Sequence, residues 1–264
     1  MKDFERLSQA ALILVSQRKG LIPIQPLPHK LRPTNEAEGY VLQGFVNQLL
    51  QRDLGPIVGY KIGCTTPVMQ KFLGIPTPCA GEVFSRAVLA GHGTVPRNAF
   101  RCIGVECEIV VSISETLSPD DYSEEKFSPM DVIGSMMVGM EIVDDRYEHY
   151  GSLGVPTLIA DNFFNSGCVL GDAFTCWDTL NFNDLSGVTR VNGVALGKGR
   201  GAQIMGSPLN ALRWFVKSMM SRGLTVQEGQ FVMLGSVVET KWLEAGDFAE
   251  VEIDALGSVS LAVE

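Results

Sequence analysis

The sequence contains little histidine and lacks an excess of positive charge. Only three of its 264 residues are histidines, and no order of serine, histidine and aspartate stands out as a triad. This scarcity argues against histidine-based nucleophilic catalysis. The 21 lysines and arginines are outnumbered by 30 aspartates and glutamates, which gives a net charge of −9. Because nucleic-acid binding relies on clustered basic side chains, we expect no nucleic-acid partner.

Paired cysteines and long apolar segments are also missing. The six cysteines form no Cys-x-x-Cys pair, and most lie in apolar contexts typical of strands. We therefore expect reduced thiols in a cytoplasmic protein, without a disulfide framework or a zinc site. No run reaches transmembrane length, and the apolar stretch 10–15 belongs to a helical pattern with no cleavage site after it. The sequence thus predicts neither a membrane segment nor a targeting peptide.

The hydrophobic pattern changes after residue 56. Residues 1–56 carry two helical patterns, at 3–18 and from Asn35 onward, separated by a proline-rich linker. Residues 57–264 are dominated by short apolar or alternating runs separated by glycine, aspartate and asparagine. The expected strands cover 58–63, 82–88, 104–113, 137–143, 166–171, 188–196, 230–235, 248–253 and 258–263. We predict an α+β protein, in which a helical N-terminal portion precedes a β-rich catalytic domain built as a mixed sheet or rolled sandwich.

Two further helices are expected within the β-rich part. Thr66 and Ser207 each precede a proline, as N-cap residues commonly do, and Gly74 and Gly223 end the two helical patterns. The glycine-rich stretch 197–201 lacks the Gly-Lys-Ser/Thr ending of a phosphate loop, so we interpret it as a flexible hairpin end.

Three acidic residues interrupt runs that are otherwise apolar. Glu106 and Glu108 would share one face of a strand, with their backbones about 7 Å apart, and both stay ionised most easily if a cation lies between them. Glu141 is a third lone acid, within the apolar run 137–143. Three carboxylates from two strands suit Mg²⁺ or Mn²⁺ and leave coordination positions for a substrate. The alternatives are solvated acids on a half-exposed strand and, for Glu141, a strand end before an acidic turn.

Lys61 is the leading candidate for a catalytic or anion-binding cation. In the expected strand it shares a face with Gly59 and Gly63, whose bare backbone would permit close approach of a small ligand. The alternative is an edge-strand lysine that blocks aggregation.

Five short motifs occur in order along nearly the whole chain. They are Gly59-Tyr60-Lys61-Ile62-Gly63, Glu106-x-Glu108, Glu141, Ala160-Asp161-Asn162 and Gly206-x-Pro208-Leu209-Asn210-Ala211-x-x-Trp214. Together they resemble the 2-keto-4-pentenoate hydratase and 4-oxalocrotonate decarboxylase branch of the fumarylacetoacetate hydrolase superfamily. The resemblance implies a mixed β-sandwich roll with a helical N-terminal part, commonly oligomeric. It also implies Mg²⁺ or Mn²⁺ held by Glu106, Glu108 and Glu141, with Lys61 beside the metal.

The chain departs from that family pattern at two positions. Cys79 stands where hydratases of this group usually carry an aspartate, and Phe164 stands where a small hydroxyl residue is common. Both changes remove polar groups expected near the reacting end of the substrate. They leave the metal ligands intact and suggest a bulkier, more apolar or differently processed substrate.

The resemblance implies an enzyme of aromatic (meta-cleavage) catabolism that acts through a metal-chelated enolate of a 2-oxo acid. Lys61 would either shuttle a proton with a lowered pKa or stay charged and hold the substrate carboxylate. A 2-hydroxy-2,4-dienoate would be hydrated, a 4-oxalocrotonate-type acid would lose CO₂, and a 2,4-diketo acid would undergo C–C hydrolysis. Two alternatives stay open: a metal enzyme for an unrelated small acid, and a catalytically retired protein that only binds 2-oxo acids.

Overall fold

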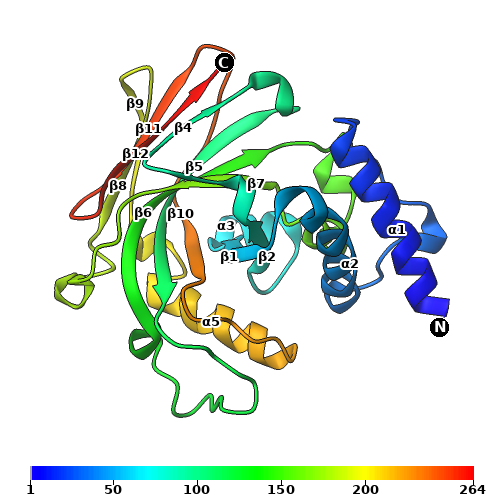
Figure 1. Ribbon diagram of the computed structural model, residues 1–264, viewed down its shortest axis with the longest axis horizontal. Coiled ribbons are helices and arrows are strands. Elements are labelled where there is room, and N and C mark those ends of the chain that lie inside the picture. Colours follow the sequence, from blue (N-terminus) through cyan, green and yellow to red (C-terminus); the bar gives the residue numbers. More distant parts are fainter. Residues whose placement is uncertain (1) are drawn as a thin grey trace.

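The computed structural model describes residues 2–264, which form two mixed β-sheets with helices packed outside them (Figure 1). Seven strands make the larger sheet, in the order β2-β1-β10-β5-β6-β7-β3, and five make the smaller, in the order β4-β12-β11-β8-β9. The strands are β1 (Ile57–Gly63), β2 (Cys79–Phe84), β3 (Val88–Ala90), β4 (His92–Val95), β5 (Ile103–Ile113), β6 (Ile133–Asp144), β7 (Asn165–Leu170), β8 (Ser186–Val191), β9 (Val194–Arg200), β10 (Phe231–Trp242), β11 (Phe248–Ile253) and β12 (Gly257–Val263). The α+β, mixed-sheet prediction is confirmed.

The main hydrophobic core lies between the two sheets. On β5, the alternate residues Val105, Cys107 and Ile109 are fully buried in this core, together with residues of β11 and β12. Full burial of a side chain such as Val105 or Ile109 stabilises the folded state by about 1.5–3 kcal/mol relative to leaving it exposed. Because successive strand residues point to opposite faces, the same packing turns Glu106 and Glu108 to the other side of the larger sheet.

The helices predicted at 3–18, from Asn35, after Thr66 and after Ser207 are present, and one further short helix, at 155–160, was not predicted. The helices are α1 (Lys2–Lys19), α2 (Glu36–Leu54), α3 (Pro67–Leu73), α4 (Val155–Ala160) and α5 (Pro208–Ser221). At the start of α2, Asn35 Oδ1 accepts a hydrogen bond from the Glu38 amide at 2.9 Å, and the Glu38 carboxylate accepts one from the Thr34 amide at 2.8 Å. Gly55 then ends α2 with a φ of +79°. At α5, Ser207 occupies the N-cap position but its side chain makes no capping hydrogen bond.

The N-terminal helices pack on the edge of the larger sheet that β2 forms (Figure 1). Leu14 of α1 and Val46 of α2 belong to one buried cluster with Phe84 of β2 and Leu158 of α4. This cluster crosses the boundary at residue 56, so the division into two parts stays a prediction. Among the described residues no helix is long and apolar enough to span a membrane.

Three strand predictions were wrong in extent. β2 covers Cys79–Phe84 rather than 82–88, and β10 continues to Trp242 rather than ending at 235. The predicted strand 188–196 is two antiparallel strands, β8 and β9, separated by a turn at 192–193. Gly235 has a φ of +129° and lies where the pairing of β10 with β5 first shifts register, between Met233 and Ser236, so a bulge divides β10 into two halves. The stretch 197–201 is not a hairpin end, because most of it belongs to β9. A Cβ on Gly199 would lie 1.7 Å from the Val237 carbonyl oxygen, so this glycine lets β9 pack against the β10 backbone.

Candidate metal centre and active-site cavity

The three predicted acids converge where β5 and β6 pair. The two strands are antiparallel with Glu106 directly opposite Glu141, while Glu108 lies opposite Gly139. One carboxylate oxygen from each of Glu106, Glu108 and Glu141 lies within 4.8 Å of the other two, and Glu108 and Glu141 are each only 1% exposed. Such a spacing of oxygen ligands matches the preference of Mg²⁺ or Mn²⁺.

Lys61 lies beside this cluster. Its Nζ is 3.3 Å from Glu141 Oε1 and the residue is 4% exposed, so the lysine is not an exposed edge residue. The prediction that glycines leave free space beside Lys61 holds for Gly63 but not for Gly59. A Cβ on Gly63 would lie 3.3 Å from Lys61 Nζ, whereas a Cβ on Gly59 would meet the Phe231 ring at 2.5 Å. Gly59 therefore makes room for a core ring rather than for a ligand.

The charges of the cluster do not balance within the protein. Burial, together with the neighbouring carboxylates of Glu141 and Glu106, raises the pKa of Glu108 well above its ordinary value. Burial and Glu141 likewise raise the pKa of Glu106. Burial alone would lower the pKa of Lys61, but the carboxylates of Glu141 and Glu106 outweigh it and raise that pKa. One ammonium cannot neutralise three buried carboxylates, so the residues present fit a divalent cation.

Each acid is held by a hydrogen-bond donor that the sequence analysis did not identify. The Gly235 amide donates to Glu108 Oε2 at 2.6 Å, and Asn165 Nδ2 donates to Glu141 Oε1 at 3.0 Å. The Thr240 hydroxyl donates to Glu106. Donors of this kind fix the orientation of metal-binding carboxylates and leave their remaining oxygens for a cation. Asn165 stands three residues after the Asp161-Asn162 motif, and this proximity was the signal that could have identified it. Thr240 was missed because the predicted strand ended at 235, before the second half of β10.

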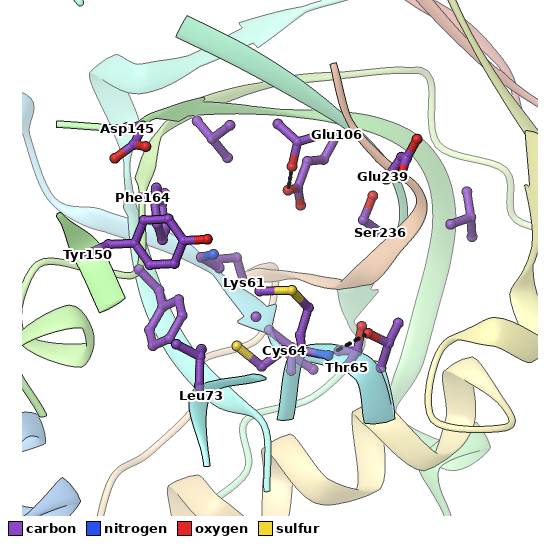
Figure 2. A pocket seen from close by; sticks show the side chains of 18 of the residues that line it. Lys61, Cys64, Thr65, Leu73, Glu106, Asp145, Tyr150, Phe164, Ser236 and Glu239 are labelled. Atoms are coloured by element: carbon purple, nitrogen blue, oxygen red, sulfur yellow. Dashed lines mark hydrogen bonds between the residues drawn. The ribbon is translucent and has the colours of Figure 1, made fainter. Parts of the chain in front are cut away.

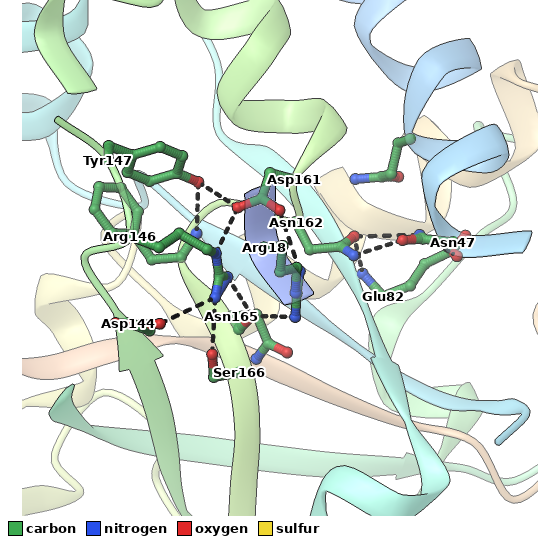
Figure 3. A network of polar contacts seen from close by, with 12 residues as sticks. Arg18, Asn47, Glu82, Asp144, Arg146, Tyr147, Asp161, Asn162, Asn165 and Ser166 are labelled. Atoms are coloured by element: carbon green, nitrogen blue, oxygen red, sulfur yellow. Dashed lines mark hydrogen bonds and ion pairs between the residues drawn. The ribbon is translucent and has the colours of Figure 1, made fainter. Parts of the chain in front are cut away.

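A buried ion-pair network connects the N-terminal helix to this centre (Figure 3). Asp161 accepts hydrogen bonds from Arg146 Nε at 2.6 Å, from the Tyr147 hydroxyl at 2.9 Å and from Arg18 of α1 at 3.2 Å. Both arginines also donate to the Asn165 carbonyl oxygen, at 2.6 and 3.1 Å. Burial alone would raise the pKa of Asp161, but Arg146 and Arg18 outweigh it and hold the pKa below its usual range. The network therefore holds the backbone of the residue whose side chain orients Glu141.

A cavity of about 660 Å³ opens onto the cluster (Figure 2). Lys61 and Glu106 line it, together with polar side chains of β10 and the aromatic side chains of Tyr150, Phe163 and Phe164. A volume of this size accommodates a small organic ligand. The cavity lining does not include Cys79, which is fully buried, and burial raises the pKa of its thiol.

Phe163 and Phe164 are placed in the cavity wall by an unusual backbone. Asn162, Phe163 and Phe164 have φ values of +58°, +49° and +71°, a left-handed conformation that costs about 1–2 kcal/mol per residue. The Asn162 side chain compensates by donating to Asn47 Oδ1 at 2.6 Å and by accepting from the Glu82 amide at 3.0 Å (Figure 3). The surrounding contacts thus hold a strained turn at the edge of the cavity, as is common at functional sites.

Residues 76–264 match the fumarylacetoacetate (FAA) hydrolase C-terminal family. The chain is 26% identical over 262 residues to the 2-keto-4-pentenoate hydratase of Paraburkholderia phymatum, with 98% of each chain covered. It is 28% identical over 255 residues to the 2-keto-4-pentenoate hydratase of Burkholderia vietnamiensis, covering 96% of this chain and 95% of that relative.

A solved structure shows the same fold over almost the entire chain. The 4-oxalocrotonate decarboxylase from Pseudomonas putida G7, complexed with magnesium and adipate, superposes with a TM-score of 0.90 at 22% identity, and 98% of each chain is covered. The likeness includes the N-terminal helical part, which lies before the region matched by the family.

Proposed function

Because the chain belongs to the fumarylacetoacetate hydrolase family, we propose that it is a metal-dependent lyase that hydrates 2-hydroxy-2,4-dienoates of the 2-keto-4-pentenoate type. The observation that carries this proposal is the convergence of Glu106, Glu108 and Glu141 beside Lys61 at the cavity. Full-length similarity to 2-keto-4-pentenoate hydratases supports the choice of reaction.

In this proposal the three glutamates are the metal ligands. A divalent cation held there, Mg²⁺ or Mn²⁺, supplies Lewis acidity that polarises a 2-oxo group and stabilises developing negative charge. Glu108 and Glu141 are fixed by Gly235 and Asn165, so their carboxylates are oriented before any ligand arrives. Glu106 lines the cavity itself, so it would border a bound substrate.

Lys61 is the proposed catalytic residue. Its raised pKa keeps the ammonium charged when no metal neutralises the neighbouring carboxylates. A charged lysine in the cavity lining can bind the substrate carboxylate. During reketonisation it can give a proton to the terminal carbon of the dienol, and the amine left behind takes up the proton released from the 2-hydroxyl group, so the ammonium is restored before water adds to the resulting enone. Cys79 lies outside the cavity lining and has a raised pKa, so it does not replace the aspartate expected at its position.

Decarboxylation of a 4-oxalocrotonate-type acid is the second candidate. It is favoured by the structural match to the Pseudomonas putida decarboxylase over 98% of both chains. The two reactions share the need for a metal-stabilised negative charge and differ in the bond that changes, since one adds water and the other loses CO₂.

A direct assay separates the two candidates. The purified protein, stripped with EDTA and reloaded with Mg²⁺ or Mn²⁺, is given 2-hydroxypenta-2,4-dienoate or 4-oxalocrotonate. The product is then identified by NMR, and CO₂ release is measured. We expect metal-dependent addition of water to the dienoate, with turnover lost in Glu106→Gln. Absence of metal-dependent turnover with both acids would refute the proposed function.

We infer further that the protein is a cytoplasmic homo-oligomer. The support for assembly is the exposure of Val194, Leu196 and Phe248 on the five-stranded sheet, where β9 is an edge strand. Sedimentation at micromolar concentration tests the oligomer part of this inference, which a monomer would overturn.

A further inference from the structure

One wall of the cavity is apolar and aromatic. The rings of Phe163, Phe164 and Tyr150 line the cavity next to one another, and Leu73 and Val143 also belong to its lining. The Tyr150 and Phe164 rings are 5.4 Å apart in an edge-to-face arrangement, and the Phe163 and Phe164 rings are 6.2 Å apart. Such packing fixes the rings as a rigid surface, and the left-handed turn at 162–164 holds two of them there at a cost in backbone energy.

Positive charge in the cavity comes from one side chain, which adjoins the aromatic wall. Among the described residues that line the cavity, Lys61 is the only one with a cationic side chain. Asp145 and Glu239 also line the cavity and are acidic, and Asp145 is shown beside Phe164 and Tyr150 in Figure 2. When the first carboxylate of a ligand occupies Lys61, a second carboxylate at the aromatic wall would therefore meet apolar rings and the like charge of Asp145. The Tyr150 hydroxyl could donate one hydrogen bond to it but could not neutralise it.

The distances set the direction in which a bound substrate would extend from Lys61. Lys61 Nζ lies 5.8 Å from the centre of the Phe163 ring and 3.3 Å from Glu141. A 2-oxo acid whose carboxylate is held at Lys61 and the glutamate cluster would thus direct its remaining carbons toward the aromatic wall. The 660 Å³ volume leaves room for a tail well beyond a five-carbon acid.

We propose that the cavity selects 2-oxo acids with a single carboxylate and an extended apolar tail, and that Phe164 is a specificity-determining residue that packs against this tail. This inference rests on the proposed function and names its substrate class. A hydroxyl side chain at this position would offer the tail a polar contact, whereas Phe164 offers an apolar surface. The same residue narrows the cavity beside Tyr150, with which its ring is in contact.

The first test compares two acids of equal length on the unchanged protein. 2-Oxohexanoate and 2-oxoadipate share the 2-oxo acid end and differ in the second carboxylate of the adipate, while pyruvate supplies the common end alone. Their Kd values are measured by calorimetry with the Mg²⁺-loaded protein. We expect 2-oxohexanoate to bind at least about tenfold more tightly than 2-oxoadipate, because the second carboxylate would be buried without a partner.

The second test assigns the selectivity to Phe164. Phe164→Ser should lower the ratio of the pyruvate Kd to the 2-oxohexanoate Kd by about tenfold, because the tail loses its apolar surface. Phe4→Ser is the matched control, since Phe4 is 63% exposed on α1 and does not line the cavity, and it should leave the ratio unchanged.

The outcomes distinguish the inference from the function it rests on. If pyruvate binds in a Mg²⁺-dependent way but 2-oxoadipate binds as tightly as 2-oxohexanoate, the inference is overturned and the proposed function stands. If pyruvate shows no Mg²⁺-dependent binding, the proposed function fails together with the inference. The comparison of the two six-carbon acids needs no variant, so it tests the selectivity for a single carboxylate even if Phe164→Ser does not fold.

Discussion

Replacing Glu108 by glutamine should stabilise the metal-free protein and at the same time remove most of the stabilisation that metal confers. Two like charges no more than 4.8 Å apart repel by at least about 3.5 kcal/mol at an effective dielectric constant near 20, and Glu108 faces two such neighbours. Lys61 offsets part of this repulsion through its attraction for the cluster. A net gain on the order of 2 kcal/mol for the metal-free Glu108→Gln protein is therefore expected. For a chain of this length that corresponds to a rise in Tm of about 4–8 °C.

Added Mg²⁺ should stabilise the wild-type protein much more than the Glu108→Gln protein. With Mg²⁺ at a hundred times its Kd, the wild-type protein gains about 2.7 kcal/mol of stability. A hundredfold weaker Kd after loss of one charged ligand would leave less than about 0.5 kcal/mol at the same Mg²⁺ concentration. The assay is thermal unfolding of EDTA-treated protein with and without added Mg²⁺.

Glu82→Gln is the matched control for this experiment. Glu82 is a largely buried carboxylate whose pKa is raised by burial, yet it hydrogen-bonds Asn47 at 2.6 Å and does not line the cavity. Its Mg²⁺-induced shift in Tm should equal that of the wild type. A Glu108→Gln protein that keeps the full Mg²⁺-induced shift, or that is less stable than wild type without metal, would refute the charge-repulsion argument.

Four further predictions follow from the same contacts. Lys61→Met should lower turnover by about 10²- to 10⁴-fold, and should also destabilise the metal-free protein by about 3–5 kcal/mol in denaturant titrations, because its 3.3 Å partner Glu141 stays buried. Asn165→Ala should weaken Mg²⁺ binding by about 10- to 100-fold in calorimetry, since Glu141 loses its amide donor. Cys79→Ala should keep turnover within about threefold of wild type in a steady-state assay, because Cys79 lies outside the cavity lining; a loss as large as that of Lys61→Met would make the thiol catalytic. The lowered pKa of Asp161 should contribute stability that is present above its unfolded pKa and lost as pH falls through the folded pKa, so Asp161→Asn should flatten the acid side of a stability-against-pH curve.

The local sequence pattern determined which face of β5 presents the metal-ligand candidates. The alternation of Val105, Cys107 and Ile109 with Glu106 and Glu108 requires only the two-residue period of a strand and a core to bury the apolar face. That is why the metal-ligand candidates could be named without a structure. The helix boundaries at Asn35, Thr66 and Gly74 are similarly local, because caps depend on residues three or four positions away.

The contacts that complete the site were decided by the tertiary structure alone. Glu106 lies opposite Glu141 because of the register of β5 with β6, and β10 separates Lys61 from these strands in the sheet. Register depends on pairing between distant segments and on bulges such as the one after Met233, which no short-range pattern specifies. The ion pair of Arg18 with Asp161 spans 143 residues of sequence, so only folding brings its two charges together.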